Sequence, residues 1–179
     1  MDFFEAIEKR YSHKENFLSD PVPLKHLEQI ARVGLLAPNG MNRQMVHMVI
    51  LPNRESVAKL CAVSPRPGLE TAPAAIAVLT DSTQAPPPPH DMNFEKEDYS
   101  AAAASMLLAA TALGYVSVWL DSPYWGEEKQ KGAHEVLGTP DTFKLWVVLP
   151  IGKPDGEGSR RDRLQPKQRI SHVRFGNGQ

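Results

Sequence analysis

The sequence predicts one domain of the α/β or α+β class. Segments with helical spacing alternate along the chain with short apolar segments typical of strands. The length of 179 residues is that of a single domain and lets the chain bury roughly two thirds of the surface that its unfolded form exposes. A hydrophobic fraction of 41% and a charged fraction of 23% are ordinary for a soluble globular protein.

Five segments have the apolar spacing or the boundary residues of helices. Asp2 is placed to cap the first helix, and Pro38 lies beyond the end of the second. Asp98 is a plausible N-cap for the Ala-rich fourth helix, which Gly114 follows, and Gly138 ends the fifth. The predicted helices are 2–11, 24–35, 55–62, 98–113 and 127–137.

Four apolar segments are predicted strands: 45–51, 74–80, 116–120 and 145–151. Two connections stand out between these elements. Residues 37–44 form a polar loop, and residues 81–97 form a Pro-rich loop in which Pro86 to Pro89 favour an extended polyproline II segment. A loop of that length is expected to be either functional or mobile.

The charge is nearly balanced overall but uneven along the chain. Twenty Lys and Arg against 21 Asp and Glu give a formal charge of −1, which argues against a nucleic-acid or membrane-surface role for the whole protein. Residues 153–179 carry a local charge of +4, so the preceding body carries −5. We expect residues 155–179 to form a basic C-terminal arm that either holds an anionic ligand or is simply solvated.

Several features indicate a cytoplasmic setting. The single cysteine, Cys61, excludes a disulfide within the chain and is expected to be a buried structural thiol. No apolar run approaches the roughly 18–20 residues that span a bilayer. The first residues do not resemble a signal peptide, so we expect neither secretion nor membrane insertion.

Common catalytic motifs are missing from the sequence. It contains no phosphate-binding P-loop, no G-x-G-x-x-G dinucleotide fingerprint and no G-x-S-x-G nucleophile turn. Its six histidines do not pair at metal-ligand spacing. His90, beside Asp91 in the Pro-rich loop, is the nearest approach to a catalytic pair and is more simply interpreted as solvated.

Three polar clusters remain as candidate ligand-binding elements. Residues 9–14 combine cations with Ser12 in an arrangement suited to a phosphate, although cations also stabilise the end of a helix. Residues 39–44 offer amide groups suited to the edge of a heteroaromatic ring, or form a simple turn. Residues 167–169 are by themselves an ordinary charged run. Together, the three clusters fit a mononucleotide-type ligand with one phosphate, a polar chain and a planar ring.

The order of these elements resembles the FMN-dependent nitroreductase family over nearly the whole chain. The basic R-x-S-x-K element is at 10–14, and the A-P-N-G-M-N-R-Q loop is at 37–44. An A-P strand start follows at 72–73, and the Asp98-led helix ends in A-T-A-L-G at 110–114. L-G-T-P at 137–140, G-K-P at 152–154 and Arg169 complete the pattern.

This resemblance implies an α+β nitroreductase-like fold with a central mixed sheet flanked by helices. It also implies a homodimer with one FMN per chain, bound at the interface by residues of both chains. Hydride would pass from NAD(P)H to FMN N5 and then to a nitroaromatic, quinone or similar small-molecule acceptor, in ping-pong order. The flavin would carry the chemistry, so no protein catalytic residue need be obvious.

The resemblance also implies roles for individual residues. Arg10, Ser12 and Lys14 would hold the FMN phosphate and ribityl chain, joined by Arg169 and Lys167. Asn42 and Gln44 would face the flavin, and the 119–122 strand end would lie near N5. The full set of predicted cofactor-binding residues is Arg10, Tyr11, Ser12, Lys14, Asn39, Asn42, Gln44, Trp119, Leu120, Asp121, Lys167 and Arg169.

The sequence departs from the family pattern at two places that bear on substrate choice. The family's Q-P-W reads Gln44-Met45-Val46, which removes an aromatic ring and a rigid turn. The middle region is short and Pro-rich where longer members carry a substrate-covering helix. Alternative readings are therefore a relative that dehalogenates or fragments a flavin, an FMN-binding module with little turnover, and a domain without flavin.

Overall fold

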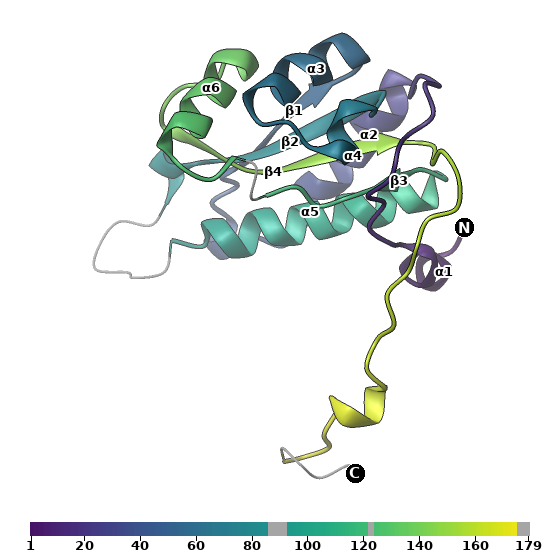
Figure 1. Ribbon diagram of the computed structural model, residues 1–179. Coiled ribbons are helices and arrows are strands. Elements are labelled where there is room, and N and C mark those ends of the chain that lie inside the picture. The colour runs from purple at the N-terminus through teal and green to yellow at the C-terminus, as the bar shows by residue number, and fades with distance from the viewer. Residues whose placement is uncertain (86–92, 122–123, 175–179) are drawn as a thin grey trace.

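A four-stranded sheet lies between two layers of helices in the computed structural model, which describes residues 1–85, 93–121 and 124–174 (Figure 1). The strands are β1 (Val46–Leu51), β2 (Ala74–Asp81), β3 (Val116–Ser117) and β4 (Phe143–Gly152). They are arranged in the order β1-β2-β4-β3. The longest strands, β2 and β4, therefore pair at the centre of the sheet.

Every strand pair in this sheet is antiparallel, which corrects the predicted mixed sheet. The mixed sheet was implied by the family resemblance, and the alternation of helices and strands along the chain does not by itself fix strand direction. Here the connection from β1 through two helices returns the chain so that β2 runs against β1. The parallel contact in the described part of the chain is an isolated bridge between Ser12 and Ser117.

The helices cover both faces of the sheet. On one face lie α2 (Leu24–Leu35) and α5 (Glu95–Ala112), with α1 (Phe3–Lys9) beside α5 (Figure 1). On the other face lie α3 (Arg54–Val63), α4 (Pro67–Glu70) and α6 (Glu127–Leu137). Three short 3₁₀ turns complete the described elements: η1 (Gly40–Asn42), η2 (Ser82–Gln84) and η4 (Pro166–Gln168).

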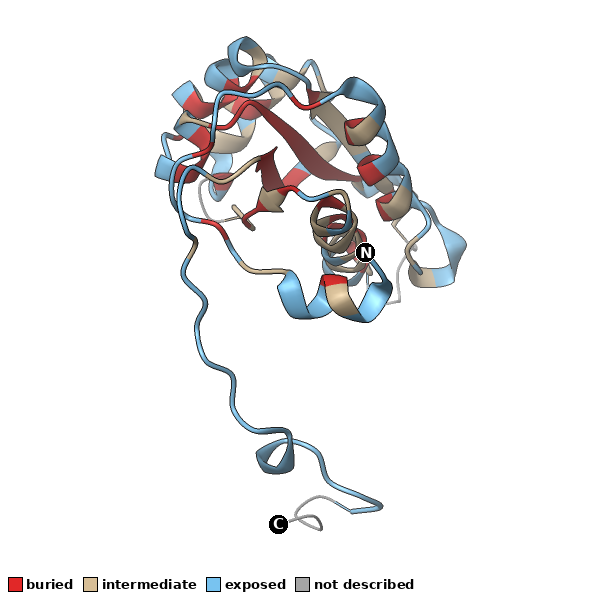
Figure 2. Cartoon of the chain, turned by 90° about the vertical axis from the view of Figure 1, so that its right-hand side faces the viewer, coloured by how far each residue is buried: buried red, intermediate tan, exposed pale blue. Residues whose placement is uncertain are grey.

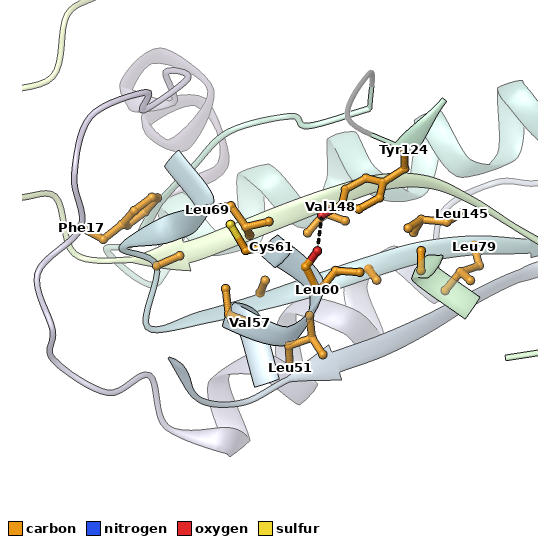
Figure 3. Close-up of a cluster of buried hydrophobic side chains, with 14 residues drawn as sticks. Phe17, Leu51, Val57, Leu60, Cys61, Leu69, Leu79, Tyr124, Leu145 and Val148 are labelled. Atoms are coloured by element: carbon orange, nitrogen blue, oxygen red, sulfur yellow. Dashed lines mark hydrogen bonds between the residues drawn. The ribbon is translucent and has the colours of Figure 1, made fainter. Parts of the chain in front are cut away.

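Two hydrophobic cores form because β2 is buried on both faces. Alternate residues of β2 point to opposite sides: Ala75, Ala77 and Leu79 pack under α3 and α6, whereas the intervening residues pack under α2 and α5. The first core includes Tyr124 and Cys61 (Figure 3). The expectation that Cys61 is a buried structural thiol is thus confirmed.

Several predicted boundaries shift. Helix α5 begins at Glu95 rather than after Asp98, because Asn93 accepts a hydrogen bond from the Glu95 N–H and the chain turns at left-handed Phe94. The predicted 81–97 loop is therefore shorter. Its proline run and His90 lie outside the described residues. Strand β3 is limited to two residues, and Leu120 beyond it forms only an isolated bridge with Val148.

The C-terminal arm leaves the body after β4. Residues 159–174 are all exposed. Both views show the arm extending away from the body, with η4 well separated from the helical layers (Figures 1 and 2). These exposed residues thus form a segment that extends away from the body. Within the described ranges, no helix is both long and apolar enough to cross a bilayer.

We predict that Leu27→Ala lowers the free energy of unfolding by about 2–5 kcal/mol, because Leu27 is fully buried in the core beneath α2. Leu24→Ala is the matched control, since Leu24 lies on the same helix and is 53% exposed. Chemical denaturation of both variants measures the difference. Equal losses for the two would contradict the assignment of this core.

Candidate functional site

The end of α1 presents a short polar segment at the edge of the sheet. Asp2 caps the helix by accepting a hydrogen bond from the Glu5 N–H at 2.9 Å, and the helix ends at Lys9. The chain then extends, and the His13 N–H donates to the Ser117 carbonyl at 2.9 Å. This bridge to β3 fixes the segment that carries Arg10, which is half-buried.

The base of the C-terminal arm rests on this same helix end. Arg160 donates to the carbonyls of Glu8, at 2.6 Å, and of Lys9. Carbonyls at a helix C-terminus lack partners within the helix, so a guanidinium satisfies them well. The Arg160 guanidinium also lies 5.6 Å from the centre of the Tyr11 ring, and Gly158 approaches that ring so closely that a Cβ there would clash.

A cavity of about 730 Å³ lies between the end of α1 and the arm base. Its lining carries five cationic side chains against one carboxylate, a formal charge of +4. The lining residues are Ile7, Glu8, Arg10, Tyr11, Ser12, Lys14, Ser159, Arg160, Arg161 and Arg163. Burial, together with the positive charges of Arg163 and Arg160, lowers the pKa of Arg10. An anion in this cavity would relieve that repulsion and accept hydrogen bonds from the guanidinium and hydroxyl groups.

A second, smaller cavity of about 140 Å³ adjoins the 39–44 loop. It lies where the end of α2, the loop and the first turns of α5 meet. Its lining residues are Gly34, Leu35, Ala37, Pro38, Asn39, Gln44, Val46, Asp98 and Ala102. The two predicted amide residues Asn39 and Gln44 thus share one surface, as expected for a group that faces a polar ligand edge.

The 39–44 loop has an unusual backbone. Met41, Asn42 and Gln44 all have positive φ angles, between 53° and 54°. Such left-handed conformations are costly for side-chain-bearing residues and persist only where surrounding contacts hold them. Here the Asn39 side chain accepts a hydrogen bond from the Gln44 N–H at 3.1 Å, which closes the loop.

Asp98 holds the same loop from beneath. Its Oδ1 accepts a hydrogen bond from the Gly40 N–H at 2.7 Å. Asp98 is buried, and its Oδ2 has no hydrogen-bond partner among the described residues. Burial, the largest effect, raises the pKa of Asp98 and outweighs the opposing effect of the Gly40 hydrogen bond. Asp98 is therefore a support for the loop rather than the predicted helix cap.

The structure brings together four of the predicted site residues in the larger cavity: Arg10, Tyr11, Ser12 and Lys14. Asn39 and Gln44 line the smaller cavity, and Asn42 is exposed at the loop surface beside it.

The other predicted residues lie elsewhere. Trp119 is half-buried, with its ring 5.8 Å from that of Tyr99. Leu120 and the half-buried Asp121 follow it along the chain. Lys167 and Arg169 sit in and just after η4 on the extended arm, so within one chain they do not join Arg10 (Figure 1).

The arginines at the arm base and the supporting role of Asp98 were not predicted from the sequence. The local positive charge of the arm includes Arg160, Arg161 and Arg163, but only residues 167–169 of the arm were predicted to bind a ligand. Nothing in the sequence revealed that the arm base would contact the carbonyls of α1, because that contact joins residues about 150 positions apart.

The chain has an α+β fold, and its larger cavity has a strongly positive lining. The sequence pattern of the nitroreductase family matches residues 7–66 and 62–153. A protein from Archaeoglobus fulgidus, provisionally named NADH dehydrogenase/NAD(P)H nitroreductase, is 36% identical over 132 residues, covering 73% of this chain and 74% of the relative. The chain therefore belongs to the nitroreductase family and is an oxidoreductase.

Solved structures agree on the fold. A nitroreductase family protein from Clostridium difficile 630 is 26% identical and covers 98% of this chain and 100% of its own, with a TM-score of 0.81. An FMN-dependent nitroreductase from Clostridium difficile R20291 is 23% identical and covers 96% of this chain and 99% of its own, with a TM-score of 0.78. The predicted nitroreductase-like fold is thus confirmed, with the strand directions corrected above.

We predict that Asp98→Asn changes how stability depends on pH. A carboxyl with a raised pKa in the folded state binds more protons than in the unfolded state, so its contribution to stability falls as pH rises above the ordinary Asp value of 3.8. Asparagine keeps the acceptor for Gly40 and does not titrate.

The free energy of unfolding of Asp98→Asn, measured relative to the natural chain, should therefore increase between about pH 4 and about pH 7. Urea denaturation at several pH values measures it. Glu28→Gln, which replaces an exposed carboxylate on α2, is the control. A difference that stays constant with pH would show that Asp98 is not perturbed by burial.

Proposed function

We propose that this protein is an FMN-dependent oxidoreductase that takes electrons from NAD(P)H and passes them to a small-molecule acceptor such as a nitroaromatic or quinone. The observation that carries the proposal is the cationic cavity at the end of α1, which gathers Arg10, Ser12 and Lys14 in a nitroreductase fold. The name of the Clostridium difficile R20291 neighbour gives FMN for that protein.

The cavity residues fit the phosphate end of FMN. A phosphate monoester carries about −1.5 to −2 charge at pH 7 and offers three acceptor oxygens. Arg10 supplies a planar fork of donors, Lys14 a point charge and Ser12 a hydroxyl donor. Ser12 and Lys14 are exposed and half-buried Arg10 lies between them and the helix, so all three can contact a ligand without moving the backbone.

The ring of the flavin would lie against the 39–44 loop. In one chain, the phosphate-binding residues and the amide loop line two separate cavities. A single flavin site that includes both sets is complete only when one chain supplies the cationic cavity and a second copy supplies the loop. This separation supports a homodimer with FMN at its interface.

Exposed apolar side chains support the same assembly. Phe3 and Phe4 on α1 are 62% and 75% exposed, and Leu164 and Ile170 on the arm are 65% and 57% exposed. Side chains of this size are normally covered, and contiguous exposed groups of them mark contact surfaces. In the proposed dimer the arm lies over the other copy, which would bring Lys167 and Arg169 to the flavin phosphate there.

Bound FMN would supply the redox chemistry, accepting hydride at N5 from the nicotinamide and releasing it to the acceptor. The protein's own contribution is to anchor the phosphate, orient the ring against the amide loop and keep that loop in its left-handed conformation through Asp98. The protons that a quinone or nitro acceptor takes up together with the hydride would come from solvent.

We predict that Arg10→Ala weakens FMN binding by about 1.5–3 kcal/mol, the range for a hydrogen bond to a charged group. Titration of flavin-free protein with FMN, followed by flavin fluorescence, measures the affinity. Arg54→Ala is the control, because Arg54 begins α3 outside both cavities. Unchanged affinity in Arg10→Ala would remove Arg10 from the site, and protein that binds no FMN would overturn the proposed function.

We also predict that deleting residues 164–179 converts the protein from a dimer to a monomer and lowers FMN affinity at least tenfold, because the arm's apolar and cationic side chains are lost together. Light scattering on a sizing column measures the mass. Deleting only 175–179 is the control and retains every described arm residue. A truncated chain that stays dimeric with full affinity would contradict the role of the arm.

A further inference from the structure

The larger cavity holds more positive charge than one phosphate monoester requires. Its lining has a formal charge of +4, whereas the phosphate of FMN contributes at most about −2. Asp155, Glu157 and Asp162 lie in the arm sequence but are not among the lining residues. An occupied FMN site would therefore still carry an excess of about two positive charges.

The excess is concentrated at the arm base. Arg10, Ser12 and Lys14 belong to the α1 side, whereas Arg161 and Arg163 face them from the arm. Within the part of the chain that the structure describes, neither arm arginine pairs with a carboxylate, and both are exposed. Arg163 is near enough to Arg10 for its charge to lower the pKa of Arg10.

Two contacts keep the arm arginines in this position. Arg160 donates hydrogen bonds to the carbonyls of Glu8 and Lys9, and Gly158 lies directly against the Tyr11 ring. The arm base is therefore fixed on α1 at two successive points immediately before Arg161. The guanidinium groups of Arg161 and Arg163 are presented beside the α1 cations by the fold rather than by chance contact of a free tail.

We propose that Arg161 and Arg163 form a second phosphate subsite next to the one formed by Arg10, Ser12 and Lys14. This inference rests on the proposed function, since it places the flavin phosphate in the first subsite. The ligand is a second phosphate group close to the first. It belongs either to the flavin, as the diphosphate of FAD, or to the electron donor, as the 2′-phosphate of NADPH.

The first experiment measures binding and does not depend on enzyme activity. The full-length chain, freed of flavin, is titrated calorimetrically with inorganic phosphate and with pyrophosphate. We expect pyrophosphate to bind at least tenfold more tightly, and the double variant Arg161→Ala, Arg163→Ala to lose that advantage because its affinity for pyrophosphate falls much more than its affinity for phosphate. Arg54→Ala is the matched control and should behave as the natural chain does.

The second experiment identifies which molecule supplies the second phosphate. If the flavin supplies it, the natural chain binds FAD in addition to FMN, and the double variant retains FMN binding but loses FAD binding. If the donor supplies it, the FMN-loaded chain prefers NADPH to NADH in kcat/KM, and the double variant loses this preference while NADH oxidation is retained.

Two results would overturn the second subsite. One is pyrophosphate binding no tighter than phosphate in the natural chain, and the other is a pyrophosphate preference that survives in the double variant. If the protein binds flavin and oxidises NAD(P)H yet gives either result, the second subsite is wrong and the proposed function stands. If the protein shows the pyrophosphate preference but does not bind FMN, the proposed function is wrong.

Discussion

The accumulation of positive charge at the end of α1 is the constraint on which the candidate site depends. Burial lowers the pKa of Arg10, and the positive charges of Arg163 and Arg160 lower it further, because like charges held together in a partly buried cavity repel one another. The fold nevertheless fixes them there, through the bridge from Ser12 to Ser117 and the hydrogen bonds from Arg160 to α1. A bound anion would stabilise this arrangement, because its negative charge offsets the repulsion among the cationic side chains.

The sheet and its two cores explain why this geometry is rigid. Strand β2 is buried on both faces, so the helices on either side are fixed relative to one another. The polar segment after α1 is attached to the edge strand β3, and the 39–44 loop is attached to α5 through Asp98. Both ligand-facing elements are therefore loops positioned by a packed scaffold, which is where proteins commonly place binding groups.

Local patterns in the sequence predicted much of this fold. The helical spacing of α2 and α6 and the apolar runs of β2 and β4 follow from burial, which acts on nearby residues. Strand direction was predicted incorrectly, because it depends on how connections cross the sheet. The start of α5 was also misplaced, because Asp98 satisfies a distant N–H of Gly40 instead of its own helix.

The candidate site was predictable to the extent that its residues are close in sequence. Arg10, Ser12 and Lys14 follow one another at intervals of two residues, and all three line one cavity. The contribution of Arg160 and its neighbours depends on a contact across about 150 residues, which no local pattern encodes. The separation of the amide loop from the cationic cavity is likewise a property of the folded chain, and it underlies the proposal that two copies complete each site.

A crystal structure of the flavin-loaded protein would locate the phosphate. We expect it within hydrogen-bond distance of Arg10 and Ser12, in the cavity between α1 and the arm base, with the flavin ring against the 39–44 loop of a second copy. A flavin whose phosphate lies elsewhere, with the cavity arginines directed into solvent, would contradict this expectation.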